Sequence, residues 1–197
     1  MLSVQDITLE RYFKPVFEPV SFELGAGQVM LLTGDNGSGK TTLLRLLAGL
    51  LRPSAGSVDL RTRSCMYVGH LLGVKDDLDV IENIEFMGRL FGGAETPLGT
   101  ILDRSGLRQV ASQLARTLSA GQRKRCALSR LLVRRSDLWL LDEPYSNLDQ
   151  EGIQLMDNML HTHIEHGGAC VLATHGSLRP RGVDFEECKL VPGRVGQ

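Results

Sequence analysis

The sequence contains no long hydrophobic run. Its longest apolar stretches are short pieces such as VMLL (29–32) and LWLL (138–141), and crossing a bilayer takes roughly 18 residues or more. The first residues, MLSVQDITLERYF, carry acidic side chains where a secretory signal is apolar, so we expect no signal peptide. Any association with a membrane is therefore expected to depend on a partner protein.

An excess of charge of either sign is also missing. There are 22 Lys and Arg against 23 Asp and Glu, which gives a net charge of −1, whereas nucleic-acid-binding domains are usually basic. The four cysteines form no CxxC pair, which argues against a zinc site or a thiol redox motif. We expect a folded protein of a reducing compartment that does not bind nucleic acid.

What the sequence does contain is an alternation of strand and helix patterns. Apolar runs in the segments 29–33, 137–144 and 169–175 predict strands that are buried on both faces. Helical spacing follows the first of these runs, with five leucines predicted on one helix face, namely Leu43, Leu44, Leu47, Leu50 and Leu51. This alternation predicts one α/β domain over 1–197 with a largely parallel sheet. Residues 71–134 are predicted to form a helical lobe inserted into a core lobe of 1–70 and 135–197.

A phosphate-binding loop is the most specific local pattern. The segment GDNGSGKT (34–41) matches G-x-x-x-x-G-K-[ST] in full, between a predicted strand and a predicted helix. Such a loop points backbone N–H groups at phosphates, and the helix N-terminus adds a positive dipole end. We therefore predict binding of ATP with Mg²⁺, with Lys40 at the β- and γ-phosphates and the Thr41 hydroxyl on the metal. The predicted nucleotide-binding residues are Gly34, Asp35, Asn36, Gly37, Ser38, Gly39, Lys40, Thr41 and Thr42.

Two adjacent acids end a second buried strand in the segment LWLLDEP (138–144). Ligands of parallel α/β sheets bind at the carboxyl ends of the strands, and neighbouring strand residues point to opposite faces. Asp142 and Glu143 are therefore expected to act differently. We predict that Asp142 is a Mg²⁺ ligand, and that Glu143 polarises the attacking water or accepts its proton.

A basic helix start follows at LSAGQRKR (118–125). Its first turn lacks Asp and Glu, which helix dipoles favour there, and carries small residues followed by basic ones. The pattern predicts either an anion-binding site or a capped basic helix that faces solvent.

Taken together, these segments resemble the ABC ATPases. GDNGSGKTT, LSAGQ, LWLLDEP, SNLD (146–149) and VLATH (171–175) occur in the family's order and span most of the chain. LSAGQ differs from the family's LSGGQ signature at Ala120. The resemblance implies a P-loop NTPase fold of the ABC type, with a RecA-like parallel sheet, an antiparallel β edge and an inserted helical subdomain.

The resemblance also implies a head-to-tail homodimer, in which each ATP lies between one subunit's phosphate loop and the partner's signature. Matching positions then receive roles: signature residues at the partner's γ-phosphate, an aspartate across the interface, a histidine at the γ-phosphate and an aromatic residue on adenine. These are Ser119, Gly121, Gln122, Asp149, His175 and Tyr12. Phe13 could take the place of Tyr12 at adenine, and ordinary core packing is the alternative role for these aromatic residues.

One position departs from the family. ABC ATPases place a glutamine after the strand that follows the phosphate loop, and this chain has His70 there, in MYVGH (66–70). Imidazole offers one donor and one acceptor and titrates near neutral pH, and we assign His70 to the catalytic group. This position, together with THGSL (174–178), resembles the ATP-binding subunits of haem exporters in cytochrome c maturation. That resemblance implies transmembrane permease partners and a peripheral place on the cytoplasmic side of a bacterial inner membrane.

Three other functions remain open at this point. The chain could be the ATPase subunit of a different ABC exporter. A soluble ABC ATPase that acts on DNA or ribosomes would usually have two ATPase halves, coiled-coil insertions or basic extensions. A regulatory module without turnover would usually lack some of the catalytic residues, and Lys40, Asp142, Glu143 and His175 are all present.

Overall fold

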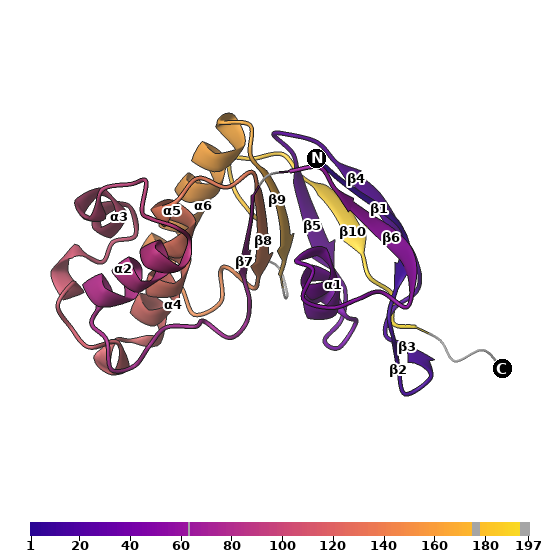
Figure 1. The fold of residues 1–197 in the computed structure, drawn as a ribbon, viewed down its shortest axis with the longest axis horizontal. Helices are drawn as coiled ribbons and strands as arrows, with labels where there is room; N and C mark the ends of the chain where they lie inside the picture. Colours follow the sequence, from indigo (N-terminus) through magenta and orange to yellow (C-terminus); the bar gives the residue numbers. More distant parts are fainter. Residues whose placement is uncertain (63, 175–177, 194–197) are drawn as a thin grey trace.

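A five-stranded parallel sheet is the centre of the fold (Figure 1), with strand order β10-β5-β9-β8-β7. The structure is a computed structural model and describes residues 1–62, 64–174 and 178–193. The strands are β5 (Val29–Thr33), β7 (Cys65–Val68), β8 (Leu138–Asp142), β9 (Ala169–Ala173) and β10 (Glu186–Lys189). The three apolar runs predicted as buried strands are thus confirmed.

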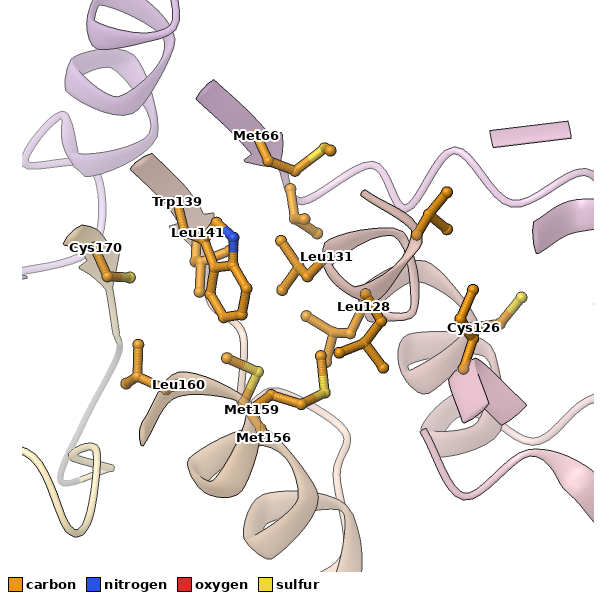
Figure 2. Packing of buried hydrophobic residues seen from close by; sticks show 14 of the residues in the cluster. Met66, Cys126, Leu128, Leu131, Trp139, Leu141, Met156, Met159, Leu160 and Cys170 are labelled. Carbon is orange, nitrogen blue, oxygen red and sulfur yellow. The ribbon is translucent and has the colours of Figure 1, made fainter. Parts of the chain in front are cut away.

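Two hydrophobic cores, one on each face of this sheet, explain why the inner strands read as continuous apolar runs. On β5, Val29 and Leu31 belong to the core shared with the helices from α2 onward, whereas Met30 and Leu32 belong to the core shared with α1. Successive side chains of a strand point to opposite faces, so a strand covered on both sides has no position for a polar residue. Figure 2 shows the first core, where Trp139 and Leu141 of β8 meet sulfur and leucine side chains of three helices.

A second, antiparallel sheet with strand order β4-β1-β6 lies at the right of the molecule in Figure 1. It shares the second core with α1, which therefore has apolar neighbours from both sheets. A short hairpin, β2-β3, projects beyond it. The bounds are β1 (Leu2–Thr8), β2 (Glu10–Arg11), β3 (Lys14–Pro15), β4 (Val20–Leu24), β6 (Ala55–Leu60) and α1 (Lys40–Leu47). This small sheet confirms the predicted antiparallel β component.

The helices between β7 and β8 lie together with α6 on the other side of the parallel sheet (Figure 1). Asp79 begins α2 with a capping box, in which its side chain and that of Glu82 each accept a backbone N–H of the other. The helices are α2 (Val80–Leu90), α3 (Leu98–Arg104), the 3-10 turns η1 (Arg108–Val110) and η2 (Ala115–Thr117), α4 (Ala120–Leu128), α5 (Arg130–Val133) and α6 (Gln150–Glu165).

The helix after the phosphate loop is shorter than its leucine spacing predicts. It ends at Leu47, and Gly49 follows with φ +69°, a left-handed conformation that favours glycine and ends helices. Leu50 therefore leaves the helix face, and its side chain is 61% exposed. The prediction that Leu50 lies on the buried helix face was wrong, because the leucine spacing continues past Gly49, where the helix has already ended.

A half-buried histidine joins α6 to the sheet. The His163 ring stacks on Trp139 with 3.9 Å between ring centroids and 5° between planes, and its Nε2 donates to the Ala169 carbonyl at 3.0 Å. Burial lowers the pKa of His163 to about 4, although the bond to Ala169 acts in the opposite direction. The neutral ring is therefore a structural part of this contact.

Replacing His163 by Phe is expected to make stability less sensitive to acid. Between the ordinary histidine pKa of 6.5 and the folded value of about 4, the unfolded chain binds the proton and the folded chain does not. The free energy of unfolding therefore falls as the pH drops through this window, by roughly 3 kcal/mol in total. Denaturant titrations at pH 7 and pH 4 measure this loss. Equal losses in His163→Phe and the parent chain would contradict it.

Candidate active site

The phosphate loop between β5 and α1 is held open by glycines in left-handed conformations. The φ angles of Gly34, Gly37 and Gly39 are +138°, +80° and +99°, and side chains with a Cβ avoid this region. The Lys40 ammonium folds back over the loop and donates to the carbonyl oxygens of Gly34 at 2.7 Å and Asp35 at 3.1 Å. A cation thus lies in the concave loop where the motif predicts phosphate.

Two of these glycines are also needed because of close neighbours. A Cβ on Gly34 would lie 2.6 Å from the Leu190 carbonyl oxygen and 2.7 Å from Ser38 Oγ. A Cβ on Gly39 would lie 2.6 Å from Phe17 Cδ1. At Gly37 nothing lies within 4 Å of the added atom. The sequence motif predicts glycine at the first and last of these positions, and the structure supplies the steric reason.

The acidic end of β8 meets the start of α1. The Thr41 hydroxyl donates to Asp142 Oδ2 at 2.8 Å, and Asp142 is 2% exposed. A hydroxyl and a carboxylate, both hard oxygen donors, therefore converge beside the phosphate loop, and such a donor set fits Mg²⁺. Asp142 lies on the face of the sheet that α1 covers, together with Leu138 and Leu140, as the alternation of side chains along β8 predicts.

Glu143 has an unusual backbone conformation. Its φ is +52°, although it carries a side chain, and its N–H donates to the Ala173 carbonyl at 2.9 Å. The next turn is fixed by Ser146, whose hydroxyl donates back to the Glu143 carbonyl at 2.9 Å. Strained backbone of this kind costs roughly 1–3 kcal/mol and is concentrated at functional sites. The sequence contains no signal for this conformation.

A cavity of about 500 Å³ brings most of these side chains together. Its walls contain the second half of the phosphate loop, the acidic strand end, the turn after it and His70. The lining residues are Arg11, Val16, Asn36, Gly37, Gly39, Lys40, Thr41, Thr42, His70, Asp142, Glu143, Ser146 and Asn147. His70 was predicted here from the resemblance to ABC ATPases, which place a glutamine at this position, while Arg11 and Val16 were not predicted. A neighbouring cavity of about 610 Å³ includes Gly34, Asp35 and Thr174.

The predicted adenine contact lies at the tip of the β2-β3 hairpin. Tyr12 is 94% exposed and Phe13 is 96% exposed, so core packing is wrong as an alternative for Tyr12. Both have positive φ angles, +51° and +60°, in the two-residue turn. Neither lines the cavity, but Arg11, which comes just before the turn, and Val16, which follows β3, do. The structure therefore places an exposed aromatic pair next to the cavity without a contact inside it.

The signature segment does not line this cavity, and it begins α4 instead. Ser119 and Gln122 form a capping box: the Ser119 hydroxyl accepts the Gln122 N–H at 3.2 Å, and Gln122 Oε1 accepts the Ser119 N–H at 2.9 Å. Ser119 remains exposed. A Cβ on Gly121 would lie 3.0 Å from the Asn147 carbonyl oxygen, so the helix start packs against the turn after Glu143.

The basic residues after the signature are not a free cationic surface. Arg123 pairs with Asp76, and its Nη1 donates to the Ala115 carbonyl at 3.2 Å. Lys124 is 2% exposed. The first turn of α4 has no acidic residue of its own. The negative charge beside it comes from Asp76, which lies in a loop far away in the sequence. The Ser119 cap agrees with the second alternative given above, but these paired and buried side chains do not face solvent. The first alternative, an anion-binding site, stays a prediction.

Asp149, predicted as an interface residue, caps α6. Its Oδ1 accepts the Gly152 N–H at 2.8 Å, which stabilises the helix start. His175, predicted at the γ-phosphate, lies outside the described residues. Over the described ranges, no group of three His, Cys, Asp or Glu side chains has the arrangement of a metal site. The proposed Mg²⁺ site, Thr41 with Asp142, contains only one residue of these types and is therefore not such a group.

Comparison with known proteins adds three findings. Residues 17–146 match the family model described as ABC transporter. The chain is 45% identical over 187 residues to the cytochrome c biogenesis ATP-binding export protein CcmA of Xanthomonas axonopodis pv. citri, covering 90% of this chain and 87% of that protein. It is 38% identical to the protein of the same name from Pseudomonas putida, covering 96% of both chains.

Solved structures show the same fold. An ABC transporter ATP-binding protein from Pyrococcus furiosus superposes with a TM-score of 0.82 at 21% identity, covering 96% of both chains. A dimeric ATP-binding cassette bound to ADP and Pi superposes with a TM-score of 0.78 at 21% identity, covering 89% of this chain and 88% of that one. None of the helices in the described parts of the chain is both long and apolar enough to span a bilayer.

Proposed function

Because the chain belongs to the ABC transporter family, we propose that it is the ATP-hydrolysing subunit of an exporter in cytochrome c biogenesis. The observation that carries the ATPase role is the single cavity shared by Lys40, Asp142 and Glu143. The observation that carries the biological role is the 45% identity to a cytochrome c biogenesis export protein over 90% of the chain.

ATP binding would begin at the phosphate loop. The Lys40 ammonium would leave the Gly34 and Asp35 carbonyls and turn to the phosphates, which are better partners for a cation than neutral carbonyls. The buried Ser38 hydroxyl has no partner among the described residues, and it would gain one when a phosphate fills the loop. Backbone N–H groups at the start of α1 complete the anion site.

Mg²⁺ would be held by Thr41 and, directly or through water, by Asp142, whose oxygens already meet at 2.8 Å. When bound, the ion neutralises phosphate charge during transfer. Thr41 and Asp142 come from different elements, α1 and β8, so the hydrogen bond between them prepares the site before the ion arrives.

Glu143 is the residue that would accept a proton from the attacking water. Its left-handed φ and its bond to Ala173 direct it away from the course of β8, and it lines the same cavity as Lys40. A carboxylate placed in this way increases the nucleophilicity of water that is aligned with the γ-phosphate. His70 faces the same cavity and would bind water or phosphate oxygen with an imidazole nitrogen. For His175 the same role follows from sequence resemblance alone.

The signature segment would act on a second nucleotide. Ser119 is exposed, and the signature residues lie outside the lining of the chain's own cavity. This arrangement supports a head-to-tail homodimer, in which Ser119, Gly121 and Gln122 approach the ATP of the partner. Asp149 would approach the interface while it caps α6. Tyr12, exposed at the hairpin tip, would stack on adenine.

Membrane attachment would come from transmembrane permease subunits, with this chain peripheral on the cytoplasmic side of a bacterial inner membrane. The helices between β7 and β8 gather at one end of the molecule in Figure 1 and support the proposed division into a core lobe (1–70 and 135–197) and a helical lobe (71–134). The helical lobe would transmit movements of the ATP site to the permease.

Deletion of the gene, followed by a haem stain for c-type cytochromes, tests the biological role. We expect the stained bands to disappear and to return with the parent chain, but not with a hydrolysis-deficient Glu143→Gln variant. Normal c-type cytochromes after deletion would reject this role and favour the ATPase subunit of a different ABC exporter. An ATPase assay of the purified chain separates the two parts of the proposal.

A further inference from the structure

The loop between β7 and α2 is held by arginine side chains of the two helices that follow the signature. Arg130, the first residue of α5, donates from Nη2 to the Leu72 carbonyl and from Nε to the Ala127 carbonyl at 2.8 Å. Arg123 of α4 reaches the same loop, where its Nη2 donates to the Val74 carbonyl at 3.4 Å. A segment of turns and irregular backbone is therefore fastened through its carbonyl groups to helices far along the chain.

Arg130 is an unusual arginine because its guanidinium is half-buried and, within the described part of the chain, bonds carbonyl oxygens and no carboxylate. Arg89, at the surface, pairs with Glu85 instead. Burial lowers the pKa of Arg130, yet a guanidinium stays charged in proteins. Because withdrawing a charge from water costs free energy, the bonds to the two carbonyls are what offsets that cost.

His70 lies between two fixed points of this loop. Before it, a Cβ on Gly69 would lie 2.6 Å from the Tyr67 hydroxyl, so the backbone passes close over β7. After it, Arg130 holds the carbonyl two residues further along. The chain then turns at Gly73 with φ +67°, where a Cβ would lie 3.3 Å from Arg130 Nη2. A span this short between two contacts leaves the backbone of His70 little room to move.

We propose that Arg130 is a positioning residue of the ATPase site, whose guanidinium holds the Leu72 carbonyl and thereby keeps His70 directed into the cavity that contains Lys40 and Glu143. This inference rests on the proposed ATPase function, in which His70 binds water or phosphate oxygen. Arg130 is not among the described residues that line the cavity, so it acts only through the loop.

Digestion with trypsin measures whether Arg130 holds the loop, and it needs no nucleotide. Lys75 is exposed in this loop, and a protease cleaves there when the segment around it opens. We expect the purified full-length Arg130→Met chain to be cut after Lys75 roughly 10-fold faster than the parent. Arg135→Met removes a guanidinium that donates to the His166 carbonyl and is the control, with the parental rate expected. Equal rates in Arg130→Met and the parent would overturn the proposal.

ATPase kinetics measure whether Arg130 acts through His70. We expect Arg130→Met to lower kcat roughly 10-fold while KM for ATP changes less than about 2-fold, because the phosphate loop is not altered. In a chain that already carries His70→Ala, the same substitution is expected to change kcat by less than about 2-fold, since the side chain that it positions is gone. An equal loss of kcat in both backgrounds, or no loss in the parent background, would overturn the proposal.

Arg130→Lys keeps the charge but lacks the planar fork that reaches two carbonyls at once. We expect it to lie between the parent and Arg130→Met in both measurements, and it takes the place of Arg130→Met if circular dichroism shows that the latter does not fold. An inactive parent chain would reject the proposed ATPase function instead, and the rate of cleavage after Lys75 would still decide whether Arg130 holds the loop.

Discussion

Glu143→Gln is expected to bind ATP as tightly as the parent chain and to hydrolyse it roughly 10²–10⁴-fold more slowly. The amide keeps the size of the side chain but cannot accept the water proton. The phosphate loop, with Lys40 and Thr41, is not changed by this substitution. ATP that is bound but not cleaved would hold two subunits together, so the variant is expected to accumulate as a dimer in the presence of Mg²⁺ and ATP.

Phosphate release and size-exclusion chromatography measure the two parts of this prediction. Glu151→Gln is the matched control, because it makes the same chemical change at an exposed position in the first turn of α6. We expect that control to have parental turnover and to remain as monomeric as the parent. Turnover of Glu143→Gln within a few-fold of the parent would remove Glu143 from its proposed role.

Sequence predicted the parts of the site that depend on local pattern. The continuous apolar runs predicted β5, β8 and β9, because a strand covered on both faces has no polar alternation. The strand ends then placed Thr41 and Asp142 at one edge, where the structure joins them by a hydrogen bond of 2.8 Å. Such predictions succeed because parallel strands present their carboxyl ends on the same side.

Other parts depend on contacts between distant segments, and no local pattern contains them. The pairing of Arg123 with Asp76 and the burial of Lys124 both reverse the expectation of an exposed basic helix. The positive φ of Glu143 is imposed by a bond to Ala173 of the neighbouring strand. The hairpin that exposes Tyr12 was likewise not visible, because its two strands are only two residues long.

The glutamine position that His70 occupies remains the main departure from the family, and the structure sharpens what His70 can do. A Cβ on Gly69 would lie 2.6 Å from the Tyr67 hydroxyl, so the chain passes close over Tyr67 just before His70. That contact fixes where the loop leaves β7 and directs His70 into the cavity. A glutamine there would supply an amide instead of an imidazole, in the same place. The departure therefore changes the hydrogen-bonding chemistry of the site and keeps its layout.

Gly39→Ala is expected to abolish ATP binding and to destabilise the fold by about 2–4 kcal/mol. The added Cβ would lie 2.6 Å from Phe17 Cδ1 and 3.1 Å from Val16 Cγ1. Phe17 is fully buried and has no room to move away. The φ of +99° adds strain for any residue with a side chain. Relief of both would require the loop to move, and the loop carries the N–H groups proposed to bind phosphate.

Gly37→Ala separates these two costs. Gly37 also has a positive φ, +80°, but nothing lies within 4 Å of its added Cβ. It is therefore expected to lose only the backbone term of about 1–2 kcal/mol and to keep measurable nucleotide binding. Denaturant unfolding and the fluorescence of a labelled ATP analogue measure both effects. The prediction would be contradicted if Gly39→Ala lost no more stability and no more nucleotide binding than Gly37→Ala. In that case the contact with Phe17 would not matter, and glycine would be needed at position 39 only for its left-handed backbone.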